Sequence, residues 1–141
     1  MIPDFAGQTI DIVRIDWGLH LWTSENWEFV LSNTILITVQ QEGGVEQHEF
    51  DPDVEERPLP PVLEPIVGAR IEQVLVSKGG DLSIQLAGMH LTVPARPRYE
   101  AWQLAGGKGN EMFICMPRGE LMHFSPLADE PRDEERNEKE T

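Results

Sequence analysis

Two segments of the chain repeat one pattern of residue types, and this repetition restricts the fold more than any other feature of the sequence. Residues 7–15 (GQTIDIVRI) and 68–76 (GARIEQVLV) each carry a glycine, then an isoleucine and an acid, then a valine and a further aliphatic residue at the same spacing. Short segments of alternating apolar and polar residues follow each copy, separated by turn signals. The pattern predicts an internal repeat, residues 7–50 and 68–124, in which each copy forms a β-meander.

The predicted fold is therefore all-β, with two related antiparallel meanders that pack as a sandwich or close into a partial barrel. A chain of 141 residues fits one domain of modest size, and we assign residues 1–127 to it. Residues 51–67 contain five prolines and are interpreted as a linker. We expect at most one short helical turn, in the linker, with Gly68 as its end. Residues 128–141 have no aliphatic or aromatic residue after Ala128, which predicts a disordered, charged tail.

The repeated segment has a spacing that a regular strand does not accommodate. Ile10 and Val13 are three residues apart and should point to opposite faces of a strand, whereas Val13 and Ile15 should share a face. Either both faces are buried, or one extra residue resets the alternation. We expect a β-bulge at the same place in both copies, which would bend each first strand over the core.

The charge of the chain disfavours one class of partner and favours another. There are 11 basic and 25 acidic side chains, a formal net charge of −14, and phosphate backbones repel such a chain, so we expect no nucleic-acid binding. Between residues 42 and 56 there is no lysine or arginine. A solvated hairpin edge explains any one acid of this run. The run as a whole favours a surface that binds a basic protein, and selection for solubility is the alternative explanation. The members of the run are Glu42, Glu46, Glu49, Asp51, Asp53, Glu55 and Glu56.

Three tryptophans, Trp17, Trp22 and Trp27, lie close together in the sequence, at a turn and on two neighbouring strands. Core packing is the simpler explanation for tryptophan, and we expect at least one of them in the core. Exposed tryptophans are enriched among the residues that dominate protein interfaces. Each of the three that is exposed is therefore a candidate interface anchor, and a shared sheet face would make them one aromatic patch.

The segment LAGGKGNEMF, residues 104–113, has the composition of a phosphate-binding loop. Such a loop requires a strand, a GK[ST] ending and then a helix. Here Lys108 is followed by Gly109, and the alternation on both sides predicts strands, the second of them, MFICM, covered on both faces. Glycine and asparagine supply the positive φ angles of hairpin turns. We therefore interpret the loop as a turn and not as a nucleotide site.

The reactive side chains form no catalytic or metal-binding pattern. Cys115 is the single cysteine and lies in the apolar run MFICM, so we expect a buried, inert thiol. His20, His48, His90 and His123 are far apart in alternating segments and are predicted to be half-buried. No hydrolase or metalloprotease signature is present. We expect no cofactor, no metal and no enzymatic activity.

The N-terminal segment MIPDFAGQTIDI has neither a basic region nor a continuous apolar stretch. No window of the sequence approaches the ~20 apolar residues of a membrane span. These features predict a cytoplasmic protein that does not bind membranes.

The segment RYEAWQLAGGKGNEMFICMPRGELMHF resembles a bacterial, mainly actinobacterial, family of small uncharacterised proteins. The matching features are the two glycine-aliphatic strands, the linker and a Tyr-Glu-Ala-Trp element, here Tyr99, Glu100, Ala101 and Trp102. The resemblance covers residues 7–124 and implies a fold, with no activity or catalytic residues to carry over. We expect the Tyr-Glu-Ala-Trp element at the start of a strand, with Tyr99 and Trp102 in structural roles.

Three functions are compatible with these features. The leading hypothesis is a non-enzymatic protein-binding module, such as an immunity protein that occludes a basic toxin through the acidic run. The alternative is a β-barrel that binds a small ligand between walls formed by the three tryptophans. An enzyme is third, because it requires a cleft that gathers a histidine and carboxylates.

Overall fold

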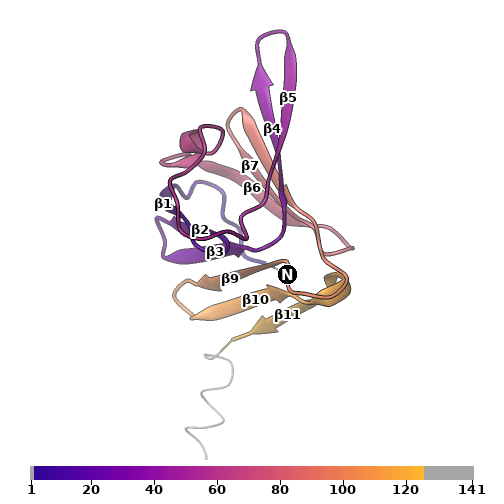
Figure 1. Cartoon of the computed structure of the whole chain (residues 1–141). Coiled ribbons are helices and arrows are strands. Elements are labelled where there is room, and N and C mark those ends of the chain that lie inside the picture. The colour runs from indigo at the N-terminus through magenta and orange to yellow at the C-terminus, as the bar shows by residue number, and fades with distance from the viewer. Residues whose placement is uncertain (1, 126–141) are drawn as a thin grey trace, which may run out of the picture.

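The computed structural model of the chain describes residues 2–125, in which eleven strands form two antiparallel sheets (Figure 1). The six-stranded sheet contains, in spatial order, β1 (Ile10–Ile15), β2 (Leu19–Thr23), β3 (Trp27–Leu31), β9 (Trp102–Gly106), β10 (Glu111–Cys115) and β11 (Leu121–Phe124). The five-stranded sheet contains β5 (Gly44–Phe50), β4 (Ile35–Gln41), β8 (Met89–Val93), β7 (Leu82–Leu86) and β6 (Ile71–Val76). The all-β prediction is confirmed. Within the described residues the sheets stay open as two layers and form no closed barrel.

Each half of the chain contributes strands to both sheets. The strands β1, β2 and β3 form a meander, after which the chain crosses over and β4 pairs with β8 in the other sheet. In the second half, β6, β7 and β8 form a meander, after which β9 crosses back and pairs with β3. The two halves therefore exchange their later strands, the β4–β5 hairpin for the β9–β10–β11 meander, and neither sheet is complete without both.

Both first strands carry the predicted bulge. The register between β1 and β2 shifts by one residue between Ile10 and Ile12, which leaves Asp11 as the extra residue. The same shift occurs between β6 and β7, where Glu72 is the extra residue. Because the bulge resets the alternation, Ile10 and Ile71 point into the core with 0% and 1% of their surface exposed.

The two repeated segments meet at their starts through matching hydrogen bonds. The backbone N–H of Gly7 donates to the carbonyl of Ile71 at 2.8 Å, and that of Gly68 donates to the carbonyl of Ile10 at 2.6 Å. In a second matched pair, the N–H of Ile10 donates to the carbonyl of Ala69, and the N–H of Ile71 donates to the carbonyl of Gln8. Each hydrogen bond donated by one segment has an equivalent bond donated by the other segment. The two segments therefore adopt the same local conformation, and they join the sheets at one end.

Inward side chains fill the space between the sheets. Residues along β2, β3, β7 and β8 alternate between buried and half-buried, as the period of two requires. Phe5 packs edge-on against Trp27 and Phe29 with ring centroids 5.1 and 5.0 Å apart. Full burial of one such side chain contributes about 1.5–3 kcal/mol. Trp102 is also buried and donates its indole N–H to the carbonyl of Gly80 at 2.8 Å.

The connections match the sequence predictions in most respects. The linker contains the predicted helical turn, η1 (Glu64–Ile66), and a second three-residue turn, η2 (Pro117–Gly119), joins β10 to β11. Trp102 begins β9 and is structural, as expected. Tyr99 is 67% exposed, so its predicted structural role is wrong: the connection from β8 to β9 crosses from one sheet to the other over the surface. The predicted tail, 128–141, lies outside the described residues.

Candidate functional site

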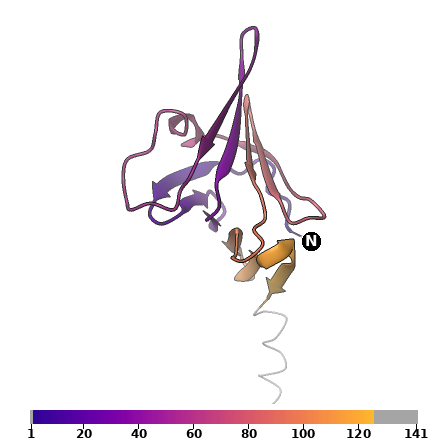
Figure 2. The ribbon, with the colours of Figure 1, turned by 45° about the vertical axis from the view of Figure 1, so that its right-hand side comes forward.

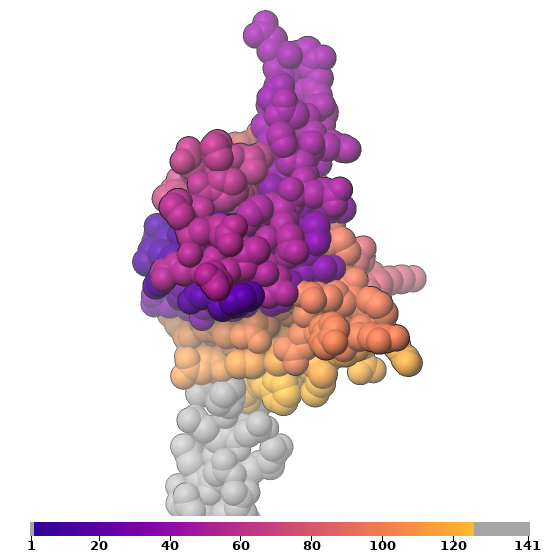
Figure 3. Space-filling model, viewed as in Figure 1, coloured from indigo at the N-terminus to yellow at the C-terminus, as the bar shows by residue number. Residues whose placement is uncertain are grey.

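The β4–β5 hairpin projects from the body of the molecule (Figures 1, 2 and 3). Every residue from 41 to 47 is exposed. Glu42 lies in the turn beside Gly43, whose φ of 88° favours glycine, and Glu46 and Glu49 lie on β5. A free two-stranded hairpin is only marginally stable, but here the start of β4 is buried and pairs with β8. The hairpin is thus an anchored arm that carries three carboxylates into solvent.

The remaining acids of the run lie on a separate segment, residues 51–57, which we call the strap. It runs beside edge strand β1: the carbonyl of Val54 accepts the N–H of Trp17 at 2.7 Å, and Arg57 forms an isolated bridge with Ile15. The acidic run that the sequence presents as one stretch therefore forms two surfaces, the arm and the strap. The exposed acids of the strap are Asp51, Asp53, Glu55 and Glu56.

Few cations lie beside these carboxylates. Among the described residues, the ion pairs of the run are Glu56 with Arg14 at 2.9 Å and Glu46 with His48 at 2.6 Å, the second charged only when the imidazole is protonated. No lysine or arginine within residues 2–125 pairs with the other acids of the run. The negative potential of the arm is therefore uncompensated and attracts cationic surfaces.

The three tryptophans do not form one patch. Trp27 faces the core, is 6% exposed and packs against Phe113, with ring centroids 6.2 Å apart. Trp22 lies on the opposite face of the same sheet, stacked on His20 at 5.8 Å. Trp17 is 59% exposed at the turn between β1 and β2, with a φ of 53°. Trp27 is thus the core tryptophan that was expected, and Trp17 and Trp22 lie at separate positions on the surface.

The outer face of the six-stranded sheet is open and largely apolar, and we call it the outer apolar face. Cross-strand pairing places Ile12, Trp22, Glu28, Ala105, Met112 and Phe124 in one row across it. A second row contains Arg14, His20, Val30, Gln103, Ile114 and Met122. The charged groups on this face contact one another or the strap: Nδ1 of His20 lies 3.2 Å from Oε2 of Glu28, and Arg14 pairs with Glu56. Exposed apolar faces with a polar rim are typical of interaction sites.

This outer apolar face corrects one sequence prediction. The segment MFICM was expected to be covered on both faces, but only Phe113 and Cys115 of β10 are buried, while Met112 and Ile114 are half-exposed on the outer face. The corresponding face of the five-stranded sheet is more polar. Its cross-strand rows contain Gln73, Ser83, Gln85, His90, Thr92, Thr38 and Gln47, and the exposed apolar residues among them are Leu36, Val45 and Leu75. Apolar outward positions are therefore more numerous on the six-stranded sheet.

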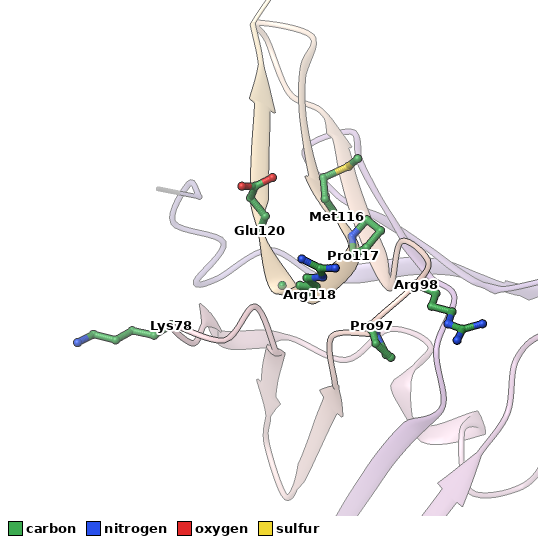
Figure 4. Close-up of a pocket in the computed structure, with 8 residues that line it drawn as sticks. Lys78, Pro97, Arg98, Met116, Pro117, Arg118 and Glu120 are labelled. Atoms are coloured by element: carbon green, nitrogen blue, oxygen red, sulfur yellow. The ribbon is translucent and has the colours of Figure 1, made fainter.

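A hollow of about 670 Å³ lies where the turn after β6 meets η2, and it is lined by Lys78, Arg98 and Arg118 among others. The two turns touch through their backbones, because a Cβ added at Gly119 would lie 1.8 Å from the carbonyl oxygen of Gly79. Figure 4 shows Lys78 and Arg98 extending away from Arg118 on opposite sides. The three cations do not converge, so this hollow presents no preformed site for a single small anion.

The glycine loop between β9 and β10 is a turn, as predicted, and β10 follows it directly. Gly107 has a φ of 73°, and a Cβ there would lie 2.6 Å from a ring carbon of Trp27. The loop is therefore rich in glycine because the indole of Trp27 packs directly against its backbone, and no helix N-terminus is present to hold a phosphate.

The remaining reactive groups are dispersed. Cys115 is 1% exposed, and burial raises the pKa of its thiol. Three of the histidines are half-buried, as expected, while His123 is exposed. Among residues 2–125, no group of three or more histidine, cysteine, aspartate or glutamate side chains is placed to hold a metal ion. No helix in that part of the chain is long and apolar enough to cross a bilayer.

The fold and these surfaces define a two-layer β-sandwich with an acidic projecting arm. The chain belongs to a family of unknown function, DUF6188, whose profile matches residues 1–125. No curated protein and no solved structure matches the chain. Membership of an uncharacterised family, which the resemblance implied, is confirmed. The actinobacterial range and the Tyr-Glu-Ala-Trp element as a family signature stay predictions.

Proposed function

We propose that the protein is a non-enzymatic protein-binding module that occludes a basic partner. One observation carries this proposal: an anchored hairpin exposes Glu42 at its projecting tip and Glu46 and Glu49 along its outer strand, and no lysine or arginine of the described residues pairs with them. Like-signed groups on a projecting arm raise the local concentration of cationic partners and accelerate their association.

The strap gives the same partner a second contact. Its acids lie beside Trp17, an exposed tryptophan whose backbone is fixed by the hydrogen bond to Val54. A rigid aromatic anchor next to charged groups is typical of residues that dominate interface energies. Binding at the arm and the strap would cover the cationic face of the partner. An immunity protein that neutralises a basic toxin is the instance of this class that we favour.

The alternative, a small-ligand barrel, has less support. It requires a cavity between the sheets, but core side chains occupy that space. Of its proposed walls, Trp27 packs in the core, and Trp17 and Trp22 lie on the surface.

The proposal is tested by affinity capture from native lysate at low salt with three tagged proteins. The first is the parent chain, and the second carries Glu42→Gln, Glu46→Gln and Glu49→Gln. The third is a charge-matched control with Glu64→Gln, Glu72→Gln and Glu100→Gln, which removes three exposed acids away from the arm.

We expect the parent and the control to capture the same basic protein, and the arm variant to capture at least tenfold less. Capture should fall as salt rises towards 1 M, where the Debye length is ~3 Å. Equal capture by the parent and the arm variant, or capture that salt does not change, contradicts recognition by the acidic arm.

A further inference from the structure

The two sheets have four edge strands, and three of them are blocked against pairing with another strand. β1 is bulged and lies beside the strap. β6 is bulged, and its start is hydrogen-bonded to residues 7 and 8. β11 has only four residues. Bulges, covering segments and short strands are the means by which proteins protect sheet edges.

The fourth edge, β5, has none of these protections. It has seven residues, pairs with β4 in an unbroken register and contains no proline or lysine. Within the described part of the chain, no backbone hydrogen bond outside the β4–β5 ladder and no isolated bridge involves β5. Its outer side therefore presents unpaired backbone groups along the projecting arm.

The direction of these backbone groups follows from one hydrogen bond. Gln40 donates its N–H to the carbonyl of Gly88 at 2.9 Å, towards β8, so Gln40 and its partner Val45 do not bond each other. Bonded and non-bonded pairs alternate in an antiparallel ladder. The N–H and C=O groups of Val45, Gln47 and Glu49 consequently point away from β4, where an added strand can pair with them.

We propose that β5 is a strand-addition site, at which an extended basic segment of the partner joins the five-stranded sheet. This inference rests on the proposed function and specifies how the acidic arm holds its partner. In strand addition, backbone hydrogen bonds supply affinity, and pockets beside the edge select side chains. Such a hollow, of about 430 Å³, lies beside the strand and is lined by residues that include Leu36, Gln47 and Thr92.

The acids on β5 define the charge pattern of the added segment. Glu46 and Glu49 are three residues apart on a regular strand, so they point to opposite faces of the sheet. A segment that carries two cations three residues apart places one beside each carboxylate. Opposite charges on neighbouring strands are favourable, and like charges are not.

The same acids exclude a second copy of this chain from the edge. Antiparallel pairing of two β5 strands brings Glu46 and Glu49 of both copies to one seam, with no lysine or arginine on either strand. Like charges on directly opposed positions are destabilising. The edge is therefore open to a basic strand while it resists self-pairing.

The test uses the full chain and a synthetic peptide, TKVTKVT, whose lysines are three residues apart. The control peptide, TKTKVVT, has the same composition with its lysines two apart and hence on one face. We expect TKVTKVT to bind at least fivefold more tightly. It should also slow amide hydrogen exchange at Val45, Gln47 and Glu49 at least tenfold, measured by NMR. Failure to protect these three amides overturns the proposal.

Two substitutions at one position separate backbone pairing from charge. Gln47→Pro removes the N–H that points away from β4, and an edge strand tolerates proline at such a position. Gln47→Ser removes the side chain but keeps this N–H. We expect at least tenfold weaker peptide binding for Gln47→Pro and less than a twofold change for Gln47→Ser. The exchange measurement on the parent chain keeps the test valid if Gln47→Pro does not fold.

The proposed function and the strand addition fail in different ways. If Gln47→Pro binds as Gln47→Ser does while the triple glutamine variant of the arm does not bind, charge alone holds the peptide and strand addition is overturned. If the triple glutamine variant binds as the parent does, recognition by the acidic arm is itself contradicted.

Discussion

Single residues fix how the turns of the two sheets meet. Gly119 has a φ of 85°, and its backbone lies directly against that of Gly79, so there is no space for a side chain. Cys115 lies beneath this contact, with its Sγ 3.4 Å from the carbonyl of Gly80, which also accepts the indole N–H of Trp102. The closeness of these turns depends on tertiary packing. The sequence around Pro117 predicts a turn but does not show what the turn packs against.

Substitution of Gly119 tests this contact. Gly119→Ala places a Cβ 1.8 Å from a backbone oxygen, so the turn after β6 must move. Gly88→Ala is the matched control, because Gly88 has a φ of 75° and open space around it. The control should lose about 1–2 kcal/mol of unfolding free energy through the left-handed conformation alone. Gly119→Ala should lose a further ~1–3 kcal/mol through overpacking. Urea denaturation measures both, and equal losses would contradict the close contact.

At the level of elements, the sequence predicts strands and their irregularities better than their partners. Alternation locates the strands, and the spacing of Ile10 and Val13 favours a bulge wherever only one face of the strand is buried, because an extra residue then allows both to face the core. The exchange of strands between the two sheets was not predictable. Whether β4 pairs with β8 or continues beside β3 depends on long-range contacts, which leave no mark on the alternation within either strand.

The candidate site was predictable in part. Composition is sufficient to identify the acidic run, but only the structure separates it into the arm and the strap. The outer apolar face was missed because Met112 and Ile114 between Phe113 and Cys115 are also the pattern of a strand covered on both sides. Whether a second layer covers such a strand depends on the rest of the fold.

The outer apolar face predicts self-association that increases with salt, opposite to the salt dependence expected of the arm. At 0.01 M salt the net charge of −14 keeps copies apart over a Debye length of ~30 Å, and at 1 M that length falls to ~3 Å. Sedimentation velocity should show at least tenfold stronger association at 1 M. Replacement of Ile12, Trp22 and Phe124 by threonine should abolish it.

A matched control replaces three exposed apolar residues that lie away from this face, Val45, Val67 and Leu75, by threonine. The control should associate as the parent does. Equal loss of association in both variants would mean that general surface hydrophobicity, and not the outer apolar face, drives it.

For the whole molecule, the exchanged strands make the two halves interdependent. The six-stranded sheet joins a three-strand meander from each half, and the five-stranded sheet joins the meander of the second half to the β4–β5 hairpin of the first. The matching hydrogen bonds between Gly7, Ile10, Gly68 and Ile71 join the sheets a second time. The core lies between the sheets and contains side chains from both halves. Neither half can bury its apolar faces alone, so a break in the connecting chain should leave the assembly intact while separation of the halves should unfold both.

This interdependence predicts that two fragments, residues 1–58 and 59–141, fold only together. The division follows Pro58, an exposed residue directly after the strap, between the last strand of the first half and η1. Each fragment alone would expose the inner faces of the strands that it contributes to both sheets, so we expect no cooperative thermal transition for either in circular dichroism. An equimolar mixture should regain the β-sheet spectrum and a single transition as a 1:1 complex. A native-like transition from one fragment alone would show that its own strands form a complete core, which contradicts the exchanged topology.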